Sequence, residues 1–230
     1  MLPGLAARFK PERIARAKAW LTWLIEYGTS GYAPEVRTRL KILNVFAYLI
    51  AAFSLIYAIQ QALADARLFA PAIALNVVVG VAALVVPFAH RISDIAGALM
   101  LALTQFIAQF LFTALFGTAS GIHLHYFAGP AAIFVIFGPR RLVLILALTA
   151  MACALHLTAA TILPSRAVGV PVDAQVLDAL YVTATVTTFT MISAVVYYAF
   201  RLADQARAET DALLRNILPE SIVDRLKAAP

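Results

Sequence analysis

The sequence predicts an all-α, polytopic membrane protein: six transmembrane helices, an N-terminal amphipathic helix and a C-terminal cytoplasmic helix of coiled-coil character. Composition gives the first indication, since 63% of the 230 residues are apolar and only 13% are charged. Soluble domains average about 45–50% apolar and 25% charged residues. The second indication is that the apolar residues gather in six runs, and the third is that the last thirty residues are abruptly polar. Such a chain must place most of its surface against lipid or other helices.

Residues 1–34 are expected to form a cytoplasmic segment with an amphipathic helix over residues 11–27. The apolar side chains of this helix fall on one face, and Trp20 and Trp23 suit the headgroup region of a membrane. We expect the helix to lie on the membrane surface; the alternative is packing against a soluble domain. Glycines and a proline predict a break at residues 27–34.

Residues 35–200 are expected to form the transmembrane domain. About twenty helical residues span the roughly 30 Å hydrocarbon core, and most of the apolar runs exceed that length. The fourth run is the shortest and contains Gly129-Pro130, which predicts a kink. The six expected spans are residues 40–64, 68–89, 95–116, 122–137, 142–163 and 176–200.

Lysines and arginines are distributed unevenly between the two sides of these spans. Sixteen of the eighteen lie in the two tails, near residue 91 or at residues 140–141, and only Arg67 and Arg166 lie in the other loops. The positive-inside rule then places both termini in the cytoplasm of a multi-pass protein of the cell membrane. The basic N-terminal margin is expected to meet anionic membrane lipid and not nucleic acid.

Residues 201–230 are expected to form a cytoplasmic helix that continues the sixth span. Five basic and five acidic residues leave it without net charge, as in a solvated helix. Steps of four, seven and four residues predict a seam that can pair with a second copy of the chain, although Glu209 interrupts it. The seam residues are Leu202, Ala206, Leu213 and Ile217.

A bend is expected near the end of this helix. Pro219 disfavours the helical conformation at Leu218 and suits the first position of a new short helix. The predicted bend therefore comprises Asn216, Ile217, Leu218 and Pro219.

Small hydroxyl residues form a stripe on the sixth span. Thr183, Thr187 and Thr190, followed by Ala194, recur at steps of three and four residues. Such a stripe lets another helix approach closely, within one subunit or across a dimer. We favour a parallel homodimer, because the same helix continues into the predicted seam.

Several polar residues should converge on the outer side of the membrane. They end the first span, open the fourth and lead into the sixth. They are Gln61, His123, His125, Tyr126, Asp173 and Asp178. Either these are solvated helix ends, or they form a pocket for an extracellular ligand or a cation, and the histidine spacing is too sparse for a metal signature.

The middle of each span lacks Asp, Glu, Lys and Arg, which lowers the case for an ion-coupled transporter. Asn44, Asn76 and His156 lie within spans, and each is expected to make an interhelical hydrogen bond. The sequence holds no phosphate-binding glycine loop, nucleophile elbow or paired catalytic carboxylates. We therefore expect no catalytic residue, cofactor site or resident metal in this chain.

One family resemblance is carried by the C-terminal residues LLRNILPESIVDRL, residues 213–226. They resemble the signal-transducing helix before the catalytic domain of membrane-bound class III adenylyl cyclases. LNVVVGVAALVVPFAHR, residues 75–91, resembles the second span of the six-span mycobacterial-type cyclases, and residues 199–209 resemble their exit from the sixth. No segment like the catalytic Asp-Ile-x-Gly-Phe-Thr motif occurs in the sequence.

The resemblance implies a homodimer of six-span subunits whose catalytic domain would follow residue 230. In this family that domain converts ATP to cyclic AMP and pyrophosphate with divalent metal, Mg²⁺ or Mn²⁺. This chain would then be the membrane anchor, dimerisation and receptor region. The alternatives are a six-span transporter or channel subunit with a regulatory tail, and the sensor region of another dimeric signalling enzyme such as a histidine kinase.

Overall fold

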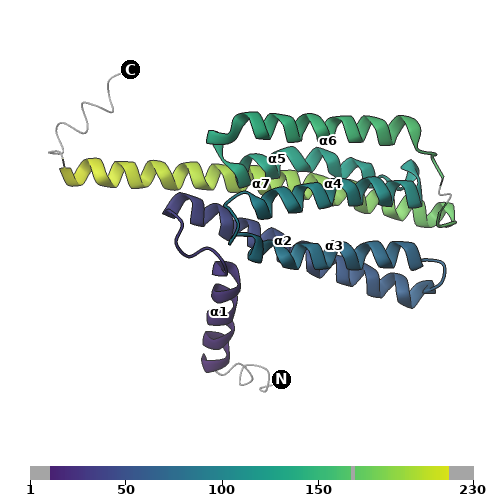
Figure 1. Ribbon diagram of the computed structural model, residues 1–230, viewed down its shortest axis with the longest axis horizontal. Helices are drawn as coiled ribbons and strands as arrows, with labels where there is room; N and C mark the ends of the chain where they lie inside the picture. The colour runs from purple at the N-terminus through teal and green to yellow at the C-terminus, as the bar shows by residue number, and fades with distance from the viewer. Residues whose placement is uncertain (1–10, 167–168, 218–230) are drawn as a thin grey trace, which may run out of the picture.

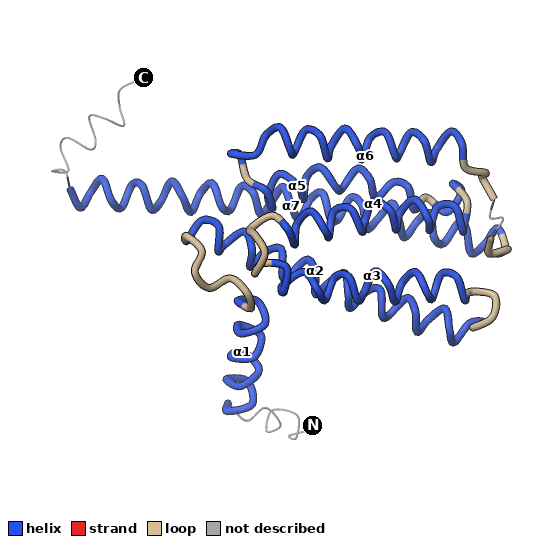
Figure 2. The backbone as a smooth tube through the Cα atoms, viewed as in Figure 1, coloured by secondary structure: helices blue, strands red, loops and turns tan. Residues whose placement is uncertain are grey.

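The computed structural model describes residues 11–166 and 169–217, which form helices joined by short connections (Figures 1 and 2). No strand occurs in that part of the chain, so the predicted all-α class is confirmed. The α-helices are α1 (Pro11–Glu26), α2 (Pro34–Asp65), α3 (Ala70–Ala89), α4 (Ala96–Phe116), α5 (Ala128–Phe137), α6 (Leu142–Ile162) and α7 (Ala174–Ile217). Three short 3-10 helices between α4 and α6 are η2 (Thr118–Ser120), η3 (Ile122–Phe127) and η4 (Pro139–Arg141).

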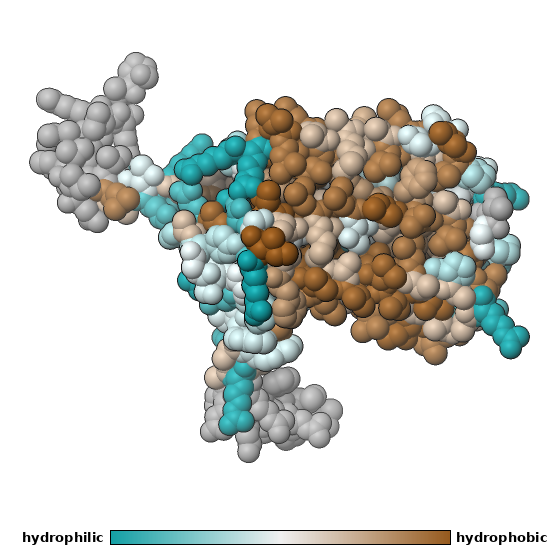
Figure 3. Space-filling view, in the orientation of Figure 1, coloured by the Kyte–Doolittle hydropathy of each residue, from teal (hydrophilic) through white to brown (hydrophobic). Residues whose placement is uncertain are grey.

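Five helical stretches are long and apolar enough to cross a membrane: α2, α3, α4, the combined η4–α6 and most of α7. They run side by side, and large apolar side chains cover the flank of the bundle between more polar ends (Figure 3). A contiguous apolar surface of this extent is not compatible with water. The chain is therefore a multi-pass membrane protein, as its composition predicts.

The fourth predicted span, residues 122–137, consists of η3 followed by α5 and is shorter than the other five. It nevertheless runs the length of the bundle. Gly121 lies against Tyr181 near the start of α7, and the Phe137 carbonyl accepts a hydrogen bond from Arg39 near the start of α2. Because a 3-10 helix rises about 2.0 Å per residue, η3 and α5 together extend about 27 Å. The helix type changes beside the Gly-Pro pair that predicts a kink.

Both described chain ends lie toward one end of the bundle, where α1 extends away from it, roughly at a right angle to the other helices, and α7 projects beyond them (Figure 1). We call this the basic end. Its basic residues are Arg37, Arg39, Lys41, Arg91, Arg140 and Arg141. The opposite end holds the turns that follow α2, α4 and α6. Charge therefore distinguishes the two ends.

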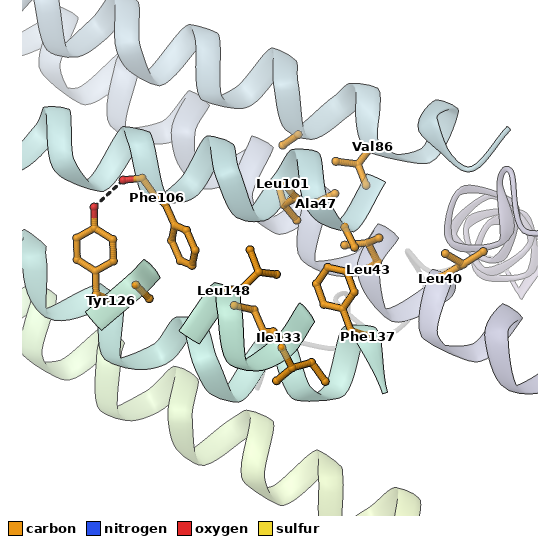
Figure 4. Packing of buried hydrophobic residues seen from close by; sticks show 14 residues of the cluster. Leu40, Leu43, Ala47, Val86, Leu101, Phe106, Tyr126, Ile133, Phe137 and Leu148 are labelled. Atoms are coloured by element: carbon orange, nitrogen blue, oxygen red, sulfur yellow. Dashed lines mark hydrogen bonds between the residues drawn. The ribbon is translucent and has the colours of Figure 1, made fainter. Parts of the chain in front are cut away.

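Apolar side chains from α2, α3, α4, α5 and α6 fill the interior of the bundle (Figure 4). Leu43 and Val86 are fully buried there. The buried Tyr126 hydroxyl donates to the Phe106 carbonyl at 2.6 Å, which satisfies a phenol that would otherwise be unpaired. Lipid tails are as apolar as these side chains, so close packing and hydrogen bonds stabilise the bundle in a bilayer.

α7 is the least enclosed of the long helices. Only 17% of its most apolar stretch is buried, against 39% for α3. Its inward face packs against η2, η3 and α5. The buried residues of that face are Leu177, Ala184, Thr188 and Val195. With 44 residues and no glycine or proline, α7 is an unbroken rod about 66 Å long. Its outward face is free to meet lipid or another helix.

A buried polar network at the basic end joins the turn after α1 to α2 and to the end of α3. The Asn44 side-chain nitrogen donates to the carbonyls of Ile25 and Tyr27, both at 2.9 Å. Asn44 Oδ1 therefore faces His90, and their 2.8 Å contact requires the proton on His90 Nε2. The Tyr32 hydroxyl in turn donates to the His90 carbonyl at 2.6 Å. The interhelical hydrogen bond predicted for Asn44 is confirmed.

The turn after α1 fits closely against the end of α3. Gly28 has φ of +72°, and a Cβ at this position would lie 2.4 Å from the Pro87 carbonyl oxygen. Only glycine fits both restrictions. Beside this turn, Glu26 pairs with Arg37 at 3.2 Å and with Lys41 at 2.6 Å. The hydrogen bond from Lys41 lowers the pKa of the Glu26 carboxyl.

Candidate functional site

The predicted outer residues that the structure brings together lie on η3, at the opposite end of the bundle. Gly121, in the left-handed conformation at φ +70°, turns the chain into this helix. η3 packs against α4, α6 and α7. It carries His123, His125 and Tyr126, so residues that adjoin one another in sequence reach three different helices. Tyr126 reaches α4 through its bond to Phe106.

His125 connects η3 to α7. Its Nδ1 lies 3.0 Å from the Ile122 carbonyl oxygen, and its Nε2 lies 3.0 Å from the Thr187 hydroxyl. A carbonyl only accepts, so a neutral His125 carries its proton on Nδ1 and accepts the Thr187 proton at Nε2. The Thr187 hydroxyl also lies 2.7 Å from the Thr183 carbonyl and 3.1 Å from the Ala184 carbonyl, so its proton has three competing acceptors. This hydroxyl can switch between η3 and its own helix.

His123 faces α6, where its ring stacks on His156 with centroids 5.3 Å apart. His156 Nδ1 also contacts the His123 carbonyl at 3.1 Å, which confirms the interhelical hydrogen bond predicted for His156. Phe127 lies 4.5 Å from the same imidazole. His123 Nδ1 is buried and has no hydrogen-bond partner in the described part of the chain. His156 was not predicted to join this cluster; its depth, about two turns from the end of α6, is the signal that matches it to η3.

A groove of about 560 Å³ lies between η3 and α7. Its lining residues are Leu124, Phe127, Tyr181, Thr185, Thr188, Phe189 and Ile192. The Thr185 and Thr188 hydroxyls are buried and have no hydrogen-bond partner among the described residues, and Thr188 is only 5% exposed. An apolar groove with unpaired hydroxyls suits a lipophilic molecule that carries a hydrogen-bonding group. The sequence analysis missed Thr185 and Thr188 because the groove exists only where η3 meets α7.

No hydrogen bond or ion pair in the described residues joins the remaining predicted outer residues to the histidines. Gln61 Oε1 accepts a hydrogen bond from Asn76 at 3.1 Å, which confirms the bond predicted for Asn76 and ties α2 to α3. Asp173 and Asp178 are exposed and make neither a hydrogen bond nor an ion pair with the histidines. Within residues 11–166 and 169–217, no three His, Cys, Asp or Glu side chains are placed to hold a metal ion.

The predicted stripe on α7 is divided between two environments. Thr187 faces η3, whereas Thr183 and Thr190 are exposed on the flank of the bundle. Beyond the bundle, Leu202 is half-buried, Ala206 is exposed and Leu213 is 61% exposed. Asn216 and Ile217 belong to the last turn of α7. Leu218 and Pro219 lie outside the described residues, so the bend there stays a prediction.

The stripe and the seam point in different directions around α7. At about 100° per residue, Thr190 and Leu202 are roughly 120° apart around the helix axis. The seam instead continues the inward face, because Leu202 follows Val195 by seven residues. A left-handed supercoil corrects only about 20° per heptad and does not bring the two into line. One straight pairing of α7 helices therefore cannot use both contacts.

Comparison with known proteins identifies relatives over most of the chain. The family model MASE7 matches residues 29–212. Adenylate cyclases of Mycobacterium bovis and Mycobacterium tuberculosis are 28% identical over 208 residues, which cover 86% of this chain and 46% of each relative. The chain thus spans about half the length of the curated relatives it matches. The resemblance to the membrane region of a mycobacterial-type cyclase, seen in the sequence, is confirmed, and the chain belongs to the MASE7 family of membrane-associated sensor domains.

Proposed function

We propose that this chain anchors and regulates a class III adenylyl cyclase: its spans sense a signal, and α7 transmits it to a paired catalytic domain. The support is the MASE7 match, the similarity to mycobacterial adenylate cyclases, and the projection of α7 beyond the bundle at the end from which α1 also extends (Figure 1). The catalytic domain of such a protein would convert ATP to cyclic AMP with Mg²⁺ or Mn²⁺. None of those reacting groups belongs to the membrane domain proposed here.

The proposed topology has six crossings with both termini in the cytoplasm. The unit of η3 and α5 runs from the opposite end to the basic end, and about 27 Å nearly equals the hydrocarbon core of about 30 Å. Five other stretches are long enough to cross. Six crossings return the chain to the side where it began, and the concentration of arginines there supports a cytoplasmic basic end.

The proposed dimer contact is the seam on the projecting part of α7. Leu202, Ala206 and Leu213 lie on one side of the rod, and Leu213 is exposed beyond the bundle. Burying them against a second copy would yield about 25 cal/mol per Å² in water. Glu209 within the seam weakens this pairing by facing its own copy, so the contact would be readily reversible. The exposed stripe residues Thr183 and Thr190 offer an alternative contact inside the membrane.

The proposed receptor site is the groove beside η3 together with the histidine cluster. A ligand there would touch α7 directly through Thr185 and Thr188, whose hydroxyls lack partners. It would alter the pairing of α7 only by binding one arrangement better than the other. The partners proposed for the chain are therefore membrane lipid, a second copy, and an extracellular or lipophilic ligand.

Single-cysteine crosslinking in native membranes tests this proposal. Cys153 is first replaced by serine, because it is exposed and would crosslink by itself. Cysteines at Leu202 and Leu213 should then form covalent dimers. A cysteine at Val143, which is 84% exposed on α6, serves as the control for random collisions in the bilayer. If Val143→Cys crosslinks as fast as Leu213→Cys, α7 does not form the dimer contact.

A further inference from the structure

A second cavity, at the basic end, has no role in the function proposed above. It has a volume of about 580 Å³ and lies where the end of α1, the turn after it and the turn after α3 meet. Trp23, Tyr27, Ser30, His90 and Arg91 contribute to its walls. The cavity therefore sits at the corner where α1 turns away from the bundle, at the boundary between the apolar flank and the polar end (Figures 1 and 3).

The charge available in this cavity is positive. Arg91 is exposed and makes no ion pair in the described part of the chain. Its Nη2 donates to the Tyr27 hydroxyl at 3.1 Å, and its guanidinium lies 6.0 Å from the centre of the Tyr27 ring. Glu26 also lines the cavity, but Arg37 and Lys41 already neutralise it. An anion would therefore meet an uncompensated guanidinium.

Hydrogen-bond donors accompany this charge. The Tyr27 hydroxyl accepts from Arg91, so its own proton remains available to a ligand. The Ser30 hydroxyl is exposed and has no partner in residues 11–166 or 169–217. Gly31 adds open space, since a Cβ there would meet nothing within 4 Å. A planar guanidinium with adjacent hydroxyls is the donor set that suits phosphate oxygens.

Aromatic side chains fix the depth of the cavity in the membrane. Trp23 is 57% exposed at its rim and contacts Tyr27 edge-on at 5.5 Å, and Tyr27 contacts Phe88 at 5.1 Å. Tryptophan and tyrosine concentrate at the level of lipid headgroups. A phospholipid whose phosphate is bound here would thus hold that phosphate at the depth of the other headgroups. Its acyl chains would lie along the exposed flank of α3.

We propose that this cavity binds the phosphate of an anionic membrane phospholipid, with Arg91 as the principal ligand and Tyr27 and Ser30 as supporting donors. A free phosphate ester would offer the same oxygens, and the position beside the apolar flank favours the lipid. The proposal needs only that the bundle lies in a bilayer. It is independent of the dimer contact, of the outer groove and of any catalytic domain.

Native mass spectrometry of the full chain in detergent tests this site. Phosphatidylglycerol and phosphatidylcholine are titrated separately, and the affinity for phosphatidylglycerol should be at least tenfold higher. Arg91→Gln should weaken phosphatidylglycerol binding at least fivefold. The matched control is Arg140→Gln, which removes the same charge at the same end of the bundle, where its contact with Glu35 is long at 3.9 Å. That control should change binding less than twofold.

Two further measurements separate the site from general attraction and from misfolding. Tyr27→Phe keeps the ring contacts and removes only the hydroxyl, so it should weaken binding about threefold with an unchanged melting temperature.

In bilayers of Trp20→Phe protein, Trp23 is the remaining tryptophan, and brominated phosphatidylglycerol should quench its fluorescence more than brominated phosphatidylcholine. If millimolar glycerol 3-phosphate displaces phosphatidylglycerol, the site binds soluble phosphate esters and the lipid proposal is wrong. Equal losses in Arg91→Gln and Arg140→Gln, or equal quenching by the two lipids, would overturn the proposal.

Discussion

At the basic end of the bundle, every polar hydrogen of the Asn44 and His90 side chains has an acceptor and His90 Nδ1 alone of their polar atoms lacks a partner, whereas at the opposite end neither the Thr185 nor the Thr188 hydroxyl has a partner in the described residues. Both sets of side chains are buried or nearly so. The difference lies in what each joins: Asn44 and His90 connect α1, α2 and α3, while the threonines line a groove beside η3. Polar groups that are already paired hold a joint in place. Unpaired polar groups leave binding capacity for something else.

The most damaging substitution should be Asn44→Leu. Leucine has a similar size, but it leaves the His90 Nε2 proton and the carbonyls of Ile25 and Tyr27 without partners. Each buried orphan costs about 1–3 kcal/mol, so we expect a loss of about 3 kcal/mol in the free energy of unfolding. Unfolding in mixed detergent and SDS micelles measures it. Val45→Leu, one residue along and facing lipid, should cost less than about 0.5 kcal/mol. A loss below 1 kcal/mol for Asn44→Leu would contradict the idea of a fixed joint.

Acid should loosen the basic end by a comparable or smaller amount. Burial lowers the pKa of the His90 imidazole from its ordinary value of 6.5 to about 4. Between these values the unfolded chain binds the proton and the folded chain does not, so stability is complete above pH 6.5 and falls as the pH drops towards 4. The limiting loss is about 3 kcal/mol. Chemical unfolding of wild type and His90→Gln at pH 7.5 and pH 5 isolates it. An equal acid loss in the variant would assign the effect to other groups.

The opposite end should tolerate the loss of a hydroxyl. Thr188→Val removes a hydroxyl that has no partner, so its effect on the free energy of unfolding should be within about 0.5 kcal/mol of zero or stabilising. Thr187→Val is the matched variant one residue away, and it breaks the contact with His125, at a cost of about 1 kcal/mol. The unfolding assay used for Asn44 compares them. If Thr188→Val costs as much as Thr187→Val, the groove holds no unpaired hydroxyl and the contrast between the ends disappears.

Hydropathy predicted the long helices well, because their boundaries depend on local composition. Both boundaries agree with the prediction to within about two residues for the amphipathic helix, the break after it and the spans of α3, α4 and α6. The length of the fourth predicted span was harder to judge, since a count of residues assumes a rise of 1.5 Å per residue and η3 rises more steeply. At 1.5 Å per residue, its sixteen residues would extend less than the about 27 Å that they cover as η3 and α5.

The site could be predicted only in part. His123, His125 and Tyr126 adjoin one another in sequence, and the structure places all three on η3. Their partners His156 and Thr187 come from other helices, and no local pattern reveals that pairing. The same holds for His90, whose role depends on Asn44, forty-six residues earlier in the chain. Residue types identify polar groups in a membrane protein, but the register between helices decides which of them meet.

The stripe and the seam of α7 are offset by a third of a turn around its axis, so α7 has two contact faces that point in different directions. The stripe and the seam lie on one stiff helix, because α7 contains no glycine or proline at which it could bend. When the seams of two such helices are in contact, their stripes point away from each other's helix, and the reverse holds when the stripes are in contact. Rotating both helices by about a third of a turn, roughly 120°, exchanges the contacting face without any sliding along the axis. Such a pair of helices would therefore transmit a change in rotation angle to the residues after α7. It would transmit neither a change in distance nor a force along the helix.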